Sequence, residues 1–256
     1  GLRLGLKVML PFAAAYFLSY VYRSINAIVA PHLIAEFALS SADLGLLTSV
    51  FFLAFASFQL PLGILLDRVG PRRTNAGLLL IAAVGAMVFA SSRSLSGLLA
   101  GRALIGFGMS ACLMSSIKSV TLWFPPHRQP ATTGWVLFAG GFGAMFATVP
   151  IEAAQQFAGW RGVFVIIAML TLAASAALFF ISPERNFANC QETLVEQWQG
   201  VKRVFGSAVF RRVAAGSAIF QAVNMSLQGL WAGPWLSDVA AYSRSGVALG
   251  LLGLAA

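Results

Sequence analysis

Long apolar runs separated by short polar segments constrain this chain more than any other feature. A helix that crosses a bilayer needs about 20 mostly apolar residues for a hydrocarbon core of about 30 Å. Seven runs meet this length, at 8–30, 44–66, 74–92, 97–123, 131–155, 161–182 and 212–236. An eighth begins near Ser245 and reaches Ala256. Only 10% of the residues are charged, against about 25% in soluble domains, so we predict an all-α, polytopic membrane protein.

The basic residues indicate how the chain is oriented. Of the 17 lysines and arginines, 11 fall on one side of the predicted bundle, 3 on the other and 3 inside the runs. Cytoplasmic loops carry the excess of positive charge. We therefore expect a multi-pass protein of the cytoplasmic (inner) membrane with its N-terminus in the cytoplasm. This distribution also accounts for the net charge of +9, so we expect the lipid bilayer as a partner and no nucleic acid.

A longer polar segment, 183–211, separates the sixth and seventh runs. Its apolar residues recur at helical spacing, at Leu194, Trp198, Val201 and Phe205. The opposite face carries Glu192, Glu196, Lys202 and Arg203. This pattern predicts an interfacial amphipathic helix. The chain then divides into a six-helix transmembrane bundle at 1–182, a cytoplasmic linker at 183–211 and the start of a second transmembrane bundle at 212–256.

The loop after the second run has an unusual composition for so short a segment. It reads Gly63-Ile64-Leu65-Leu66-Asp67-Arg68-Val69-Gly70-Pro71-Arg72-Arg73. It resembles the loop between the second and third helices of the major facilitator superfamily of secondary transporters, whose usual form is Gly-x-Leu-Ala-Asp-Arg-x-Gly-Arg-Lys/Arg. Here Leu66 replaces the alanine and Pro71 replaces the first basic residue.

The resemblance extends over the whole chain and implies two six-helix halves, each built from inverted three-helix repeats. The chain would supply the first half, helix 7 and the start of helix 8 of a protein with about twelve helices. The alternative is a complete seven-helix protein. The resemblance also implies a monomer.

By the same resemblance, the loop latches the cytoplasmic side in one state of an alternating-access cycle. We expect Asp67 to cap a helix N-terminus and to pair with nearby arginines, Gly70 to supply the tight turn and Gly63 to allow close helix packing. The arginines concerned are Arg68, Arg72 and Arg73. A plain positive-inside loop would account for these arginines alone.

A second motif lies in the fourth run. Gly101-Arg102-Ala103-Leu104-Ile105-Gly106-Phe107-Gly108 resembles the helix-4 family motif Arg-x-x-x-Gly-x-Gly. We expect Gly106 and Gly108 to permit close helix approach. Arg102 would then stabilise a proton-bearing site or close the outer gate. The alternative is an interfacial arginine, because Arg102 is about six residues, or about 9 Å, from the predicted outer helix end. Lys118, in the same run, is expected to snorkel, with an anion contact as the alternative.

Arg23 lies inside the first run, where a charge costs at least about 2.5–3.5 kcal/mol on insertion scales. Such a charge tends to remain only when it faces a cavity or a partner. Tyr20, Arg23 and Asn26 share one helical face by 3–4 spacing, and the resemblance places that helix along the central cavity. A guanidinium fork suits carboxylate or phosphate. We therefore expect these three residues to bind solute, with a snorkelling or acid-paired structural arginine as the alternative.

The spacing from Arg23 to Pro31 resembles the organic-anion branches of the superfamily, the anion:cation symporters and the organophosphate antiporters. The resemblance also implies that the seventh run lines the cavity. Its polar face carries Asn224, Gln228, Trp231 and Trp235. We expect the first three of these residues to contact solute. Interhelical hydrogen bonding and an aromatic belt are the alternative explanation.

Two further segments bear on the function. The fifth run holds Gly140-Gly141-x-Gly143 without the Gly-Pro-x-x-Gly-Gly motif usual in drug–proton antiporters, and Gly159-Trp160-Arg161 resembles the family's helix 5–6 junction. We find no nucleophile–base pair, paired carboxylates or metal cluster, so we expect no enzyme activity, cofactor or metal. The sequence predicts a secondary active transporter of a small organic solute, above all an organic anion, with H⁺ as a candidate coupling ion. The alternatives are proton-driven efflux of hydrophobic compounds and a non-transporting solute sensor.

Overall fold

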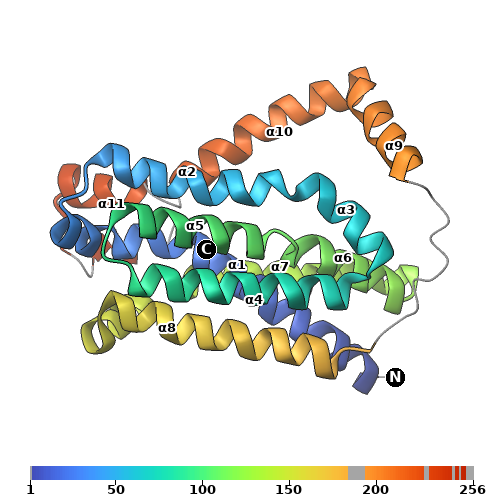
Figure 1. Ribbon diagram of the computed structural model, residues 1–256, viewed down its shortest axis with the longest axis horizontal. Coiled ribbons are helices and arrows are strands. Elements are labelled where there is room, and N and C mark those ends of the chain that lie inside the picture. Colours follow the sequence, from blue (N-terminus) through green and yellow to red (C-terminus); the bar gives the residue numbers. More distant parts are fainter. Residues whose placement is uncertain (1, 184–193, 228–230, 244–245, 248, 252–256) are drawn as a thin grey trace.

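The computed structural model describes residues 2–183, 194–227, 231–243, 246–247 and 249–251. This part of the chain is helical and contains no strand. Figure 1 shows the helices as long rods lying side by side. In chain order they are α1 (Leu2–Phe37), α2 (Ser41–Ser57), α3 (Gln59–Arg68), α4 (Pro71–Ser91), α5 (Leu95–Met109), α6 (Cys112–Trp123), η1 (Pro126–Arg128), α7 (Gln129–Phe146), α8 (Val149–Ile181), α9 (Leu194–Gly206), α10 (Ala208–Ser226), α11 (Ala232–Pro234) and η3 (Trp235–Val239).

The predicted all-α membrane fold is confirmed. Within the described ranges, four helical segments are long and apolar enough to cross a membrane, and a fifth is added when α2 and α3 are taken as one span bent by 41°. The four are Gly5–Phe37, Pro71–Ser91, Leu95–Trp123 and Val149–Ile181. α7 and α10 occupy the predicted fifth and seventh runs but are not among these segments.

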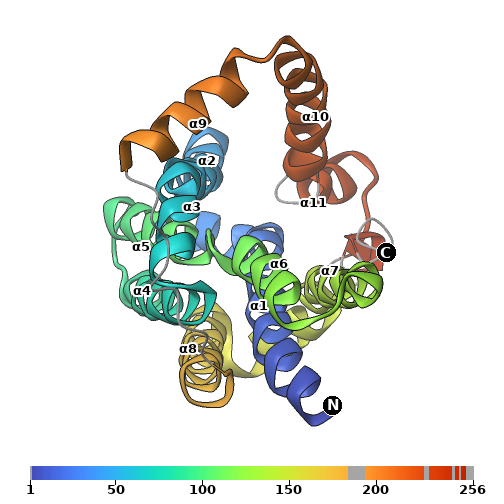
Figure 2. The same ribbon diagram turned by 90° about the vertical axis from the view of Figure 1, so that its right-hand side faces the viewer.

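The helices pack around α1, which contacts α6, α7 and α8. α4 packs between α5 and α8, and α2 packs against α5. In Figure 2, which looks along the bundle, α10 lies on the side opposite α4 and α8. The large side chains of Tyr22, Phe89 and Phe164 are fully buried where α1, α4 and α8 meet. This core fixes the position of α1, the helix that carries half of the predicted solute contacts.

Glycines bring α5 close to its neighbours. A Cβ atom added at Gly101 would lie 2.8 Å from the backbone nitrogen of Phe89 on α4, and one at Gly108 would lie 2.5 Å from the backbone nitrogen of Ala82. Gly106 makes the equivalent approach to the backbone of Phe51 on α2. Small residues allow membrane helices to approach in this way. Both glycines of the predicted helix-4 motif therefore lie at close helix contacts.

The predicted run 131–155 is not one helix, and its expected boundaries are wrong. α7 ends at Phe146, and α8 begins at Val149 with Pro150 in its first turn. Proline is favoured at that position because the backbone N–H it lacks would have no helical partner there. The next expected break becomes a kink within α8, at Gly159, which has φ +66°.

A helix is present in the linker where one is predicted. α9 spans Leu194–Gly206, and α10 then begins at Ala208, ahead of the predicted start at 212. Phe205 and Arg203 of α9 are exposed. Glu192 lies outside the described residues, as do the side chains of Leu194 and Trp198. The opposition of apolar and charged faces thus stays a prediction.

Candidate transport site and helix contacts

Arg23 is held between two aromatic rings. Its guanidinium carbon lies 5.0 Å from the ring centroid of Tyr20 on α1 and 4.6 Å from that of Phe55 on α2. The side chain is half-buried, and its Nε is buried without a hydrogen-bond partner. Within the described part of the chain, no acidic side chain forms an ion pair with it. The rings orient the guanidinium by cation–π attraction without satisfying its N–H groups.

The Tyr20 ring that contacts Arg23 packs against α7. Tyr20 meets Tyr16 edge-to-face, with ring centroids 5.1 Å apart. A Cβ added at Gly140 of α7 would lie 3.0 Å from Cδ2 of Tyr20 and closer still to the Tyr16 ring. Gly140 therefore makes room for the two tyrosines that support Arg23. The sequence alone gives no sign of this role, because the tyrosines lie on α1 and Gly140 lies on α7.

Arg102 is buried, with a side chain only 2% exposed. It donates a hydrogen bond of 3.0 Å to the carbonyl oxygen of Tyr22 and a second one to Oδ1 of Asn26. Its guanidinium carbon also lies 5.1 Å from the ring centroid of Phe89 and 5.8 Å from that of Phe164. The interfacial alternative for Arg102 is therefore wrong. The arginine joins α5 to α1 inside the bundle, through neutral partners.

Asn26 does not face a cavity in this structure. It is 2% exposed, accepts the hydrogen bond from Arg102 and donates one of 2.8 Å to Oγ1 of Thr48 on α2. Asn26 thus joins α1 to α2 and α5 in this structure, and its contact with solute stays a prediction. Helical spacing places a residue on a face, but the neighbouring helix decides what that face meets.

The loop after α3 is arranged differently from the prediction. Asp67 forms an ion pair with Lys118 of α6, which the sequence analysis expected to snorkel. The N-cap of α4 is Gly70, with φ +88° and no side-chain bond, so Asp67 is not a helix cap. Gly70 does supply the turn, because its φ is strained for any residue with a Cβ. No atom lies within 4 Å of the Cβ position of Gly63, so the described residues make no close packing there.

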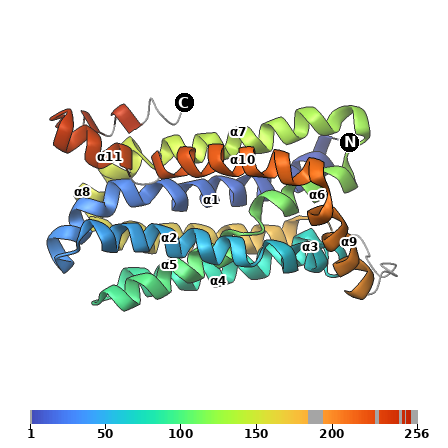
Figure 3. The ribbon, with the colours of Figure 1, turned by 90° about the horizontal axis from the view of Figure 1, so that it is seen from above.

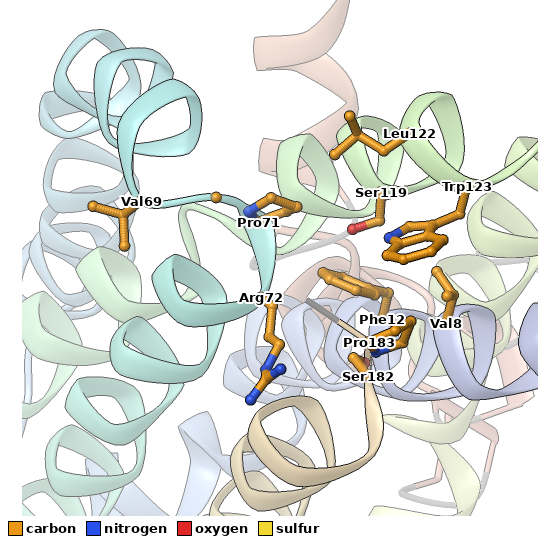
Figure 4. A pocket seen from close by; sticks show the side chains of 11 residues that line it. Val8, Phe12, Val69, Pro71, Arg72, Ser119, Leu122, Trp123, Ser182 and Pro183 are labelled. Atoms are coloured by element: carbon orange, nitrogen blue, oxygen red, sulfur yellow. The ribbon is translucent and has the colours of Figure 1, made fainter. Parts of the chain in front are cut away.

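The arginines of this loop lie at one end of the bundle. Arg68 ends α3, while Arg72 and Arg73 belong to the first turn of α4. The guanidinium carbon of Arg72 stands 5.2 Å from the ring centroid of Phe179 on α8. Figure 4 shows Arg72 pointing away from Ser119 and Trp123 across a pocket of ≈ 10 Å³. That volume holds about one water molecule, so this pocket is too small for an organic solute.

An ion pair that sequence reasoning missed closes the opposite end of the bundle. Both carboxylate oxygens of Glu36 accept from Arg161, at 2.5 and 2.7 Å, and one accepts from Nε1 of Trp160 at 2.8 Å. Arg161 also donates to the carbonyl oxygen of Ser92, at 2.8 Å. The kink at Gly159 turns Trp160 and Arg161 toward α1. This clamp joins α1, the end of α4 and α8.

The segment after α10 meets α1 at the same end. Ala232 and Leu236 are buried, and a Cβ added at Gly233 would lie 3.7 Å from Cβ of Ala27. Figure 1 shows α10 close to the other helices near α11 and rising away from them toward α9. Figure 3 shows α11 beside the end of α1. The bundle and the α10–α11 arm therefore touch at one end and separate at the other.

The predicted solute contacts of the seventh run are only partly described. Trp231 is 52% exposed and Trp235 is 56% exposed. Asn224 lies on α10, but its side chain is outside the described residues, as is the whole of Gln228. The structure brings Tyr20 and Arg23 together, and it joins Asn26 to Arg102.

Comparisons with known proteins place the chain among transporters. A family model described as "Major Facilitator Superfamily" matches residues 12–256. The D-galactonate transporter of Escherichia coli O6:H1 is 28% identical over 147 residues, which cover 57% of this chain and 34% of the relative. A probable L-galactonate transporter of Escherichia coli K12 is 28% identical over 202 residues, covering 76% and 43%. The chain therefore spans less than half the length of these relatives.

Two further similarities widen this picture. The efflux pump mlcE of Penicillium citrinum is 30% identical over 187 residues, covering 72% of this chain and 33% of the pump. A crystal structure of a bacterial homolog to the human lysosomal transporter Spinster, in an inward-facing and occupied conformation, superposes with a TM-score of 0.75. That match covers 97% of this chain and 58% of the other at 22% identity, and it therefore shows the fold alone.

Proposed function

Because the chain belongs to the Major Facilitator Superfamily, we propose that it is part of a secondary active transporter that moves a small organic anion across the cytoplasmic membrane. The anion would be a carboxylate or an organophosphate, and the mechanism alternating access. The chain spans less than half the length of its galactonate-transporting relatives, so the activity is proposed for the protein that contains it. Residues 1–182 would form its first bundle, 183–211 its linker and 212–256 the start of its second bundle.

Arg23 carries the proposal. It is a charged side chain on a membrane-spanning helix, oriented by Tyr20 and Phe55, with a buried Nε that has no hydrogen-bond partner. A buried donor left unpaired costs about 1–3 kcal/mol, and more when the group is charged. A carboxylate or phosphate would accept hydrogen bonds from the N–H groups of the guanidinium and would neutralise its charge. Binding of the anion would remove the free-energy cost of the unpaired guanidinium, and this gain would add to the affinity.

The relatives support an anionic solute. Two of them are named for galactonate, which is a carboxylate. In Arg102 the chain has a second buried cation, but that arginine is occupied by Tyr22 and Asn26. Arg23 is therefore the proposed anion contact. Tyr20 would form one wall, and Trp231 with Asn224 and Gln228 the facing wall.

The arrangement of α10 supports an alternating-access cycle. The α11 end touches α1 at Ala27, whereas α10 separates from the bundle toward α9. If the basic end is cytoplasmic and holds the N-terminus, this state is open to the cytoplasm. The Asp67–Lys118 pair and the turn at Gly70 would then position Arg68, Arg72 and Arg73 to latch that end in the opposite state. We propose H⁺ or a second solute as the driving gradient and a monomer as the working unit.

The test is solute counterflow in proteoliposomes that contain the whole transporter. The panel is galactonate, glycerol 3-phosphate, xylose and tetraphenylphosphonium, with Arg23→Ala as the variant. The matched control is Arg93→Ala, which removes an exposed arginine outside the helices. We expect exchange of an anion that falls by about 100-fold in Arg23→Ala, equivalent to one lost charged hydrogen-bonding group. The control should exchange like wild type.

Three results would separate the alternatives. Anion exchange that persists in Arg23→Ala makes that arginine structural and overturns the proposal. Exchange of tetraphenylphosphonium without anion exchange supports efflux, which the similarity to an efflux pump keeps as the second candidate. Binding of a solute without exchange supports a sensor.

A further inference from the structure

Two buried glycines of α7 meet α1 in different ways. α7 packs along α1 (Figure 2), and its buried residues include Gly140 and Gly143. A Cβ added at Gly143 would overlap the carbonyl oxygen of Phe17, which belongs to the backbone of α1. A Cβ added at Gly140 would instead lie 2.5 Å from Cε1 of the Tyr16 ring and 3.0 Å from Cδ2 of the Tyr20 ring. Gly143 therefore limits the distance between the two helices, whereas Gly140 limits the position of two side chains.

The two tyrosines connect Gly140 to the guanidinium of Arg23. Their rings meet edge-to-face, with centroids 5.1 Å apart. Tyr16 is only 3% exposed, so its surroundings leave the ring little room to move. Tyr20 is half-buried, and its ring centroid lies 5.0 Å from the guanidinium carbon of Arg23. A group that pushes on this pair of rings should therefore displace Tyr20, which is one of the two rings that orient Arg23.

A methyl group added at Gly140 would require a movement large enough to matter for binding. The Tyr16 ring would have to move by about 0.9 Å to bring its 2.5 Å contact to 3.4 Å, and the Tyr20 ring, at 3.0 Å, by about 0.4 Å. Because the rings touch, movement of Tyr16 also displaces Tyr20. The groups of a binding site must be held within about 0.5 Å of their productive positions. The required movement is of that size.

We propose that Gly140 is a positioning residue for the anion site. The missing side chain at Gly140 lets Tyr20 hold the Arg23 guanidinium where it would meet the solute, and this role rests on the proposed function of Arg23. Hydrogen bonds weaken steeply when their geometry is distorted, so a displaced guanidinium binds a carboxylate or phosphate less well. Gly140 would act through the two rings and not by contact with the anion.

Three alanine variants on α7, each made in the full-length transporter, separate a positioning role from a structural one. Gly141→Ala is the matched control, because its Cβ position has no atom within 4 Å. The probe is radiolabelled galactonate, bound at equilibrium to the purified protein in detergent. We expect Gly140→Ala to raise the dissociation constant by about tenfold, as for partial loss of a charged hydrogen bond. Gly141→Ala should bind like wild type, and Gly143→Ala should lower the melting temperature, because it forces the helix backbones apart.

A double variant identifies the rings as the cause. Tyr16→Leu removes the ring edge that the added methyl group would meet. In the Tyr16→Leu background, Gly140→Ala should therefore raise the dissociation constant by less than about threefold, since coupled residues give non-additive effects. Gly143→Ala should keep its full effect on the melting temperature in that background, because its obstruction is the backbone of Phe17. A purely structural role for Gly140 predicts no such difference.

Labelling of Arg23 with phenylglyoxal provides a readout that needs no solute. The extent of labelling is measured by mass spectrometry and normalised to the exposed Arg93. Loss of the cation–π contact with Tyr20 should raise the labelling rate of Arg23 by about threefold in Gly140→Ala, and Gly141→Ala should leave it unchanged.

The outcomes distinguish this role from the proposed function. If Arg23→Ala binds galactonate like wild type, the proposed function is overturned and the positioning role falls with it. If Arg23→Ala weakens binding but Gly140→Ala binds like Gly141→Ala, only the positioning role is overturned. An effect of Gly140→Ala that persists undiminished with Tyr16→Leu overturns it as well. Equal labelling of Arg23 in Gly140→Ala and Gly141→Ala does the same, whether or not galactonate binds.

Discussion

The close contact between α4 and α5 is defined by short interatomic distances at Gly108, and the substitution Gly108→Ala tests it. The added Cβ would lie 2.5 Å from the backbone nitrogen of Ala82 and 2.6 Å from its Cβ, whereas ordinary contacts begin near 3.4 Å. The helices would have to move apart by about 0.9 Å to bring the shorter of these distances to 3.4 Å. Both obstructing groups belong to the α4 helix rather than to a flexible side-chain end, so neither can yield alone. Overpacking of this kind costs about 1–3 kcal/mol.

Gly77→Ala on α4 is the matched control, because its Cβ position has no atom within 4 Å. The same chemical change should there be neutral or stabilising by about 0.5–1 kcal/mol, since glycine loses more backbone freedom than alanine. Both variants are measured by equilibrium unfolding in mixed micelles, with helicity as the signal. We expect Gly108→Ala to be less stable than wild type and Gly77→Ala not to be. If the two variants are equally stable, the inferred α4–α5 contact is not as close as described.

Three further changes test other contacts. Asn26→Ala should destabilise the protein by about 1–3 kcal/mol in the same assay, because it leaves buried N–H groups of Arg102 without an acceptor. Glu36→Gln should cost only about 0.2–1 kcal/mol, since its ion pair is partly exposed; a thermal melt measures this. Oxidation of the pair Ala27→Cys and Gly233→Cys should form a cross-link that stops transport reversibly, because the Cβ positions lie 3.7 Å apart, within the usual 3.5–4.5 Å.

Each of these has a clear contrary outcome. Wild-type stability of Asn26→Ala would show that Arg102 is satisfied elsewhere. A loss well above 1 kcal/mol in Glu36→Gln would show that the clamp is more deeply buried than described. Transport that continues after complete cross-linking, shown by gel mobility before and after reduction, would mean that the contact at Ala27 does not open during the cycle.

The helical membrane architecture could be predicted from the sequence because its causes are local. An apolar run must satisfy its backbone hydrogen bonds internally in a bilayer, and a single helix does this without help from distant residues. The turn at Gly70 and the close-packing glycines 106 and 108 were expected from the resemblance to the family motifs. The fifth run was given wrong boundaries because hydropathy continues across Pro150, where a new helix starts. Arg23 stood out as a charge within an apolar run.

The partners of the polar groups were decided only by the tertiary structure. Asp67 pairs with Lys118, 51 positions away, and Arg161 pairs with Glu36 across 125 positions. Helical periodicity states which residues share a face, but it does not state which other helix covers that face or at what height. Asn26 was therefore assigned to a polar face of α1, but its bonds to Arg102 and Thr48 could not be foreseen. Those contacts form only when the helices pack together.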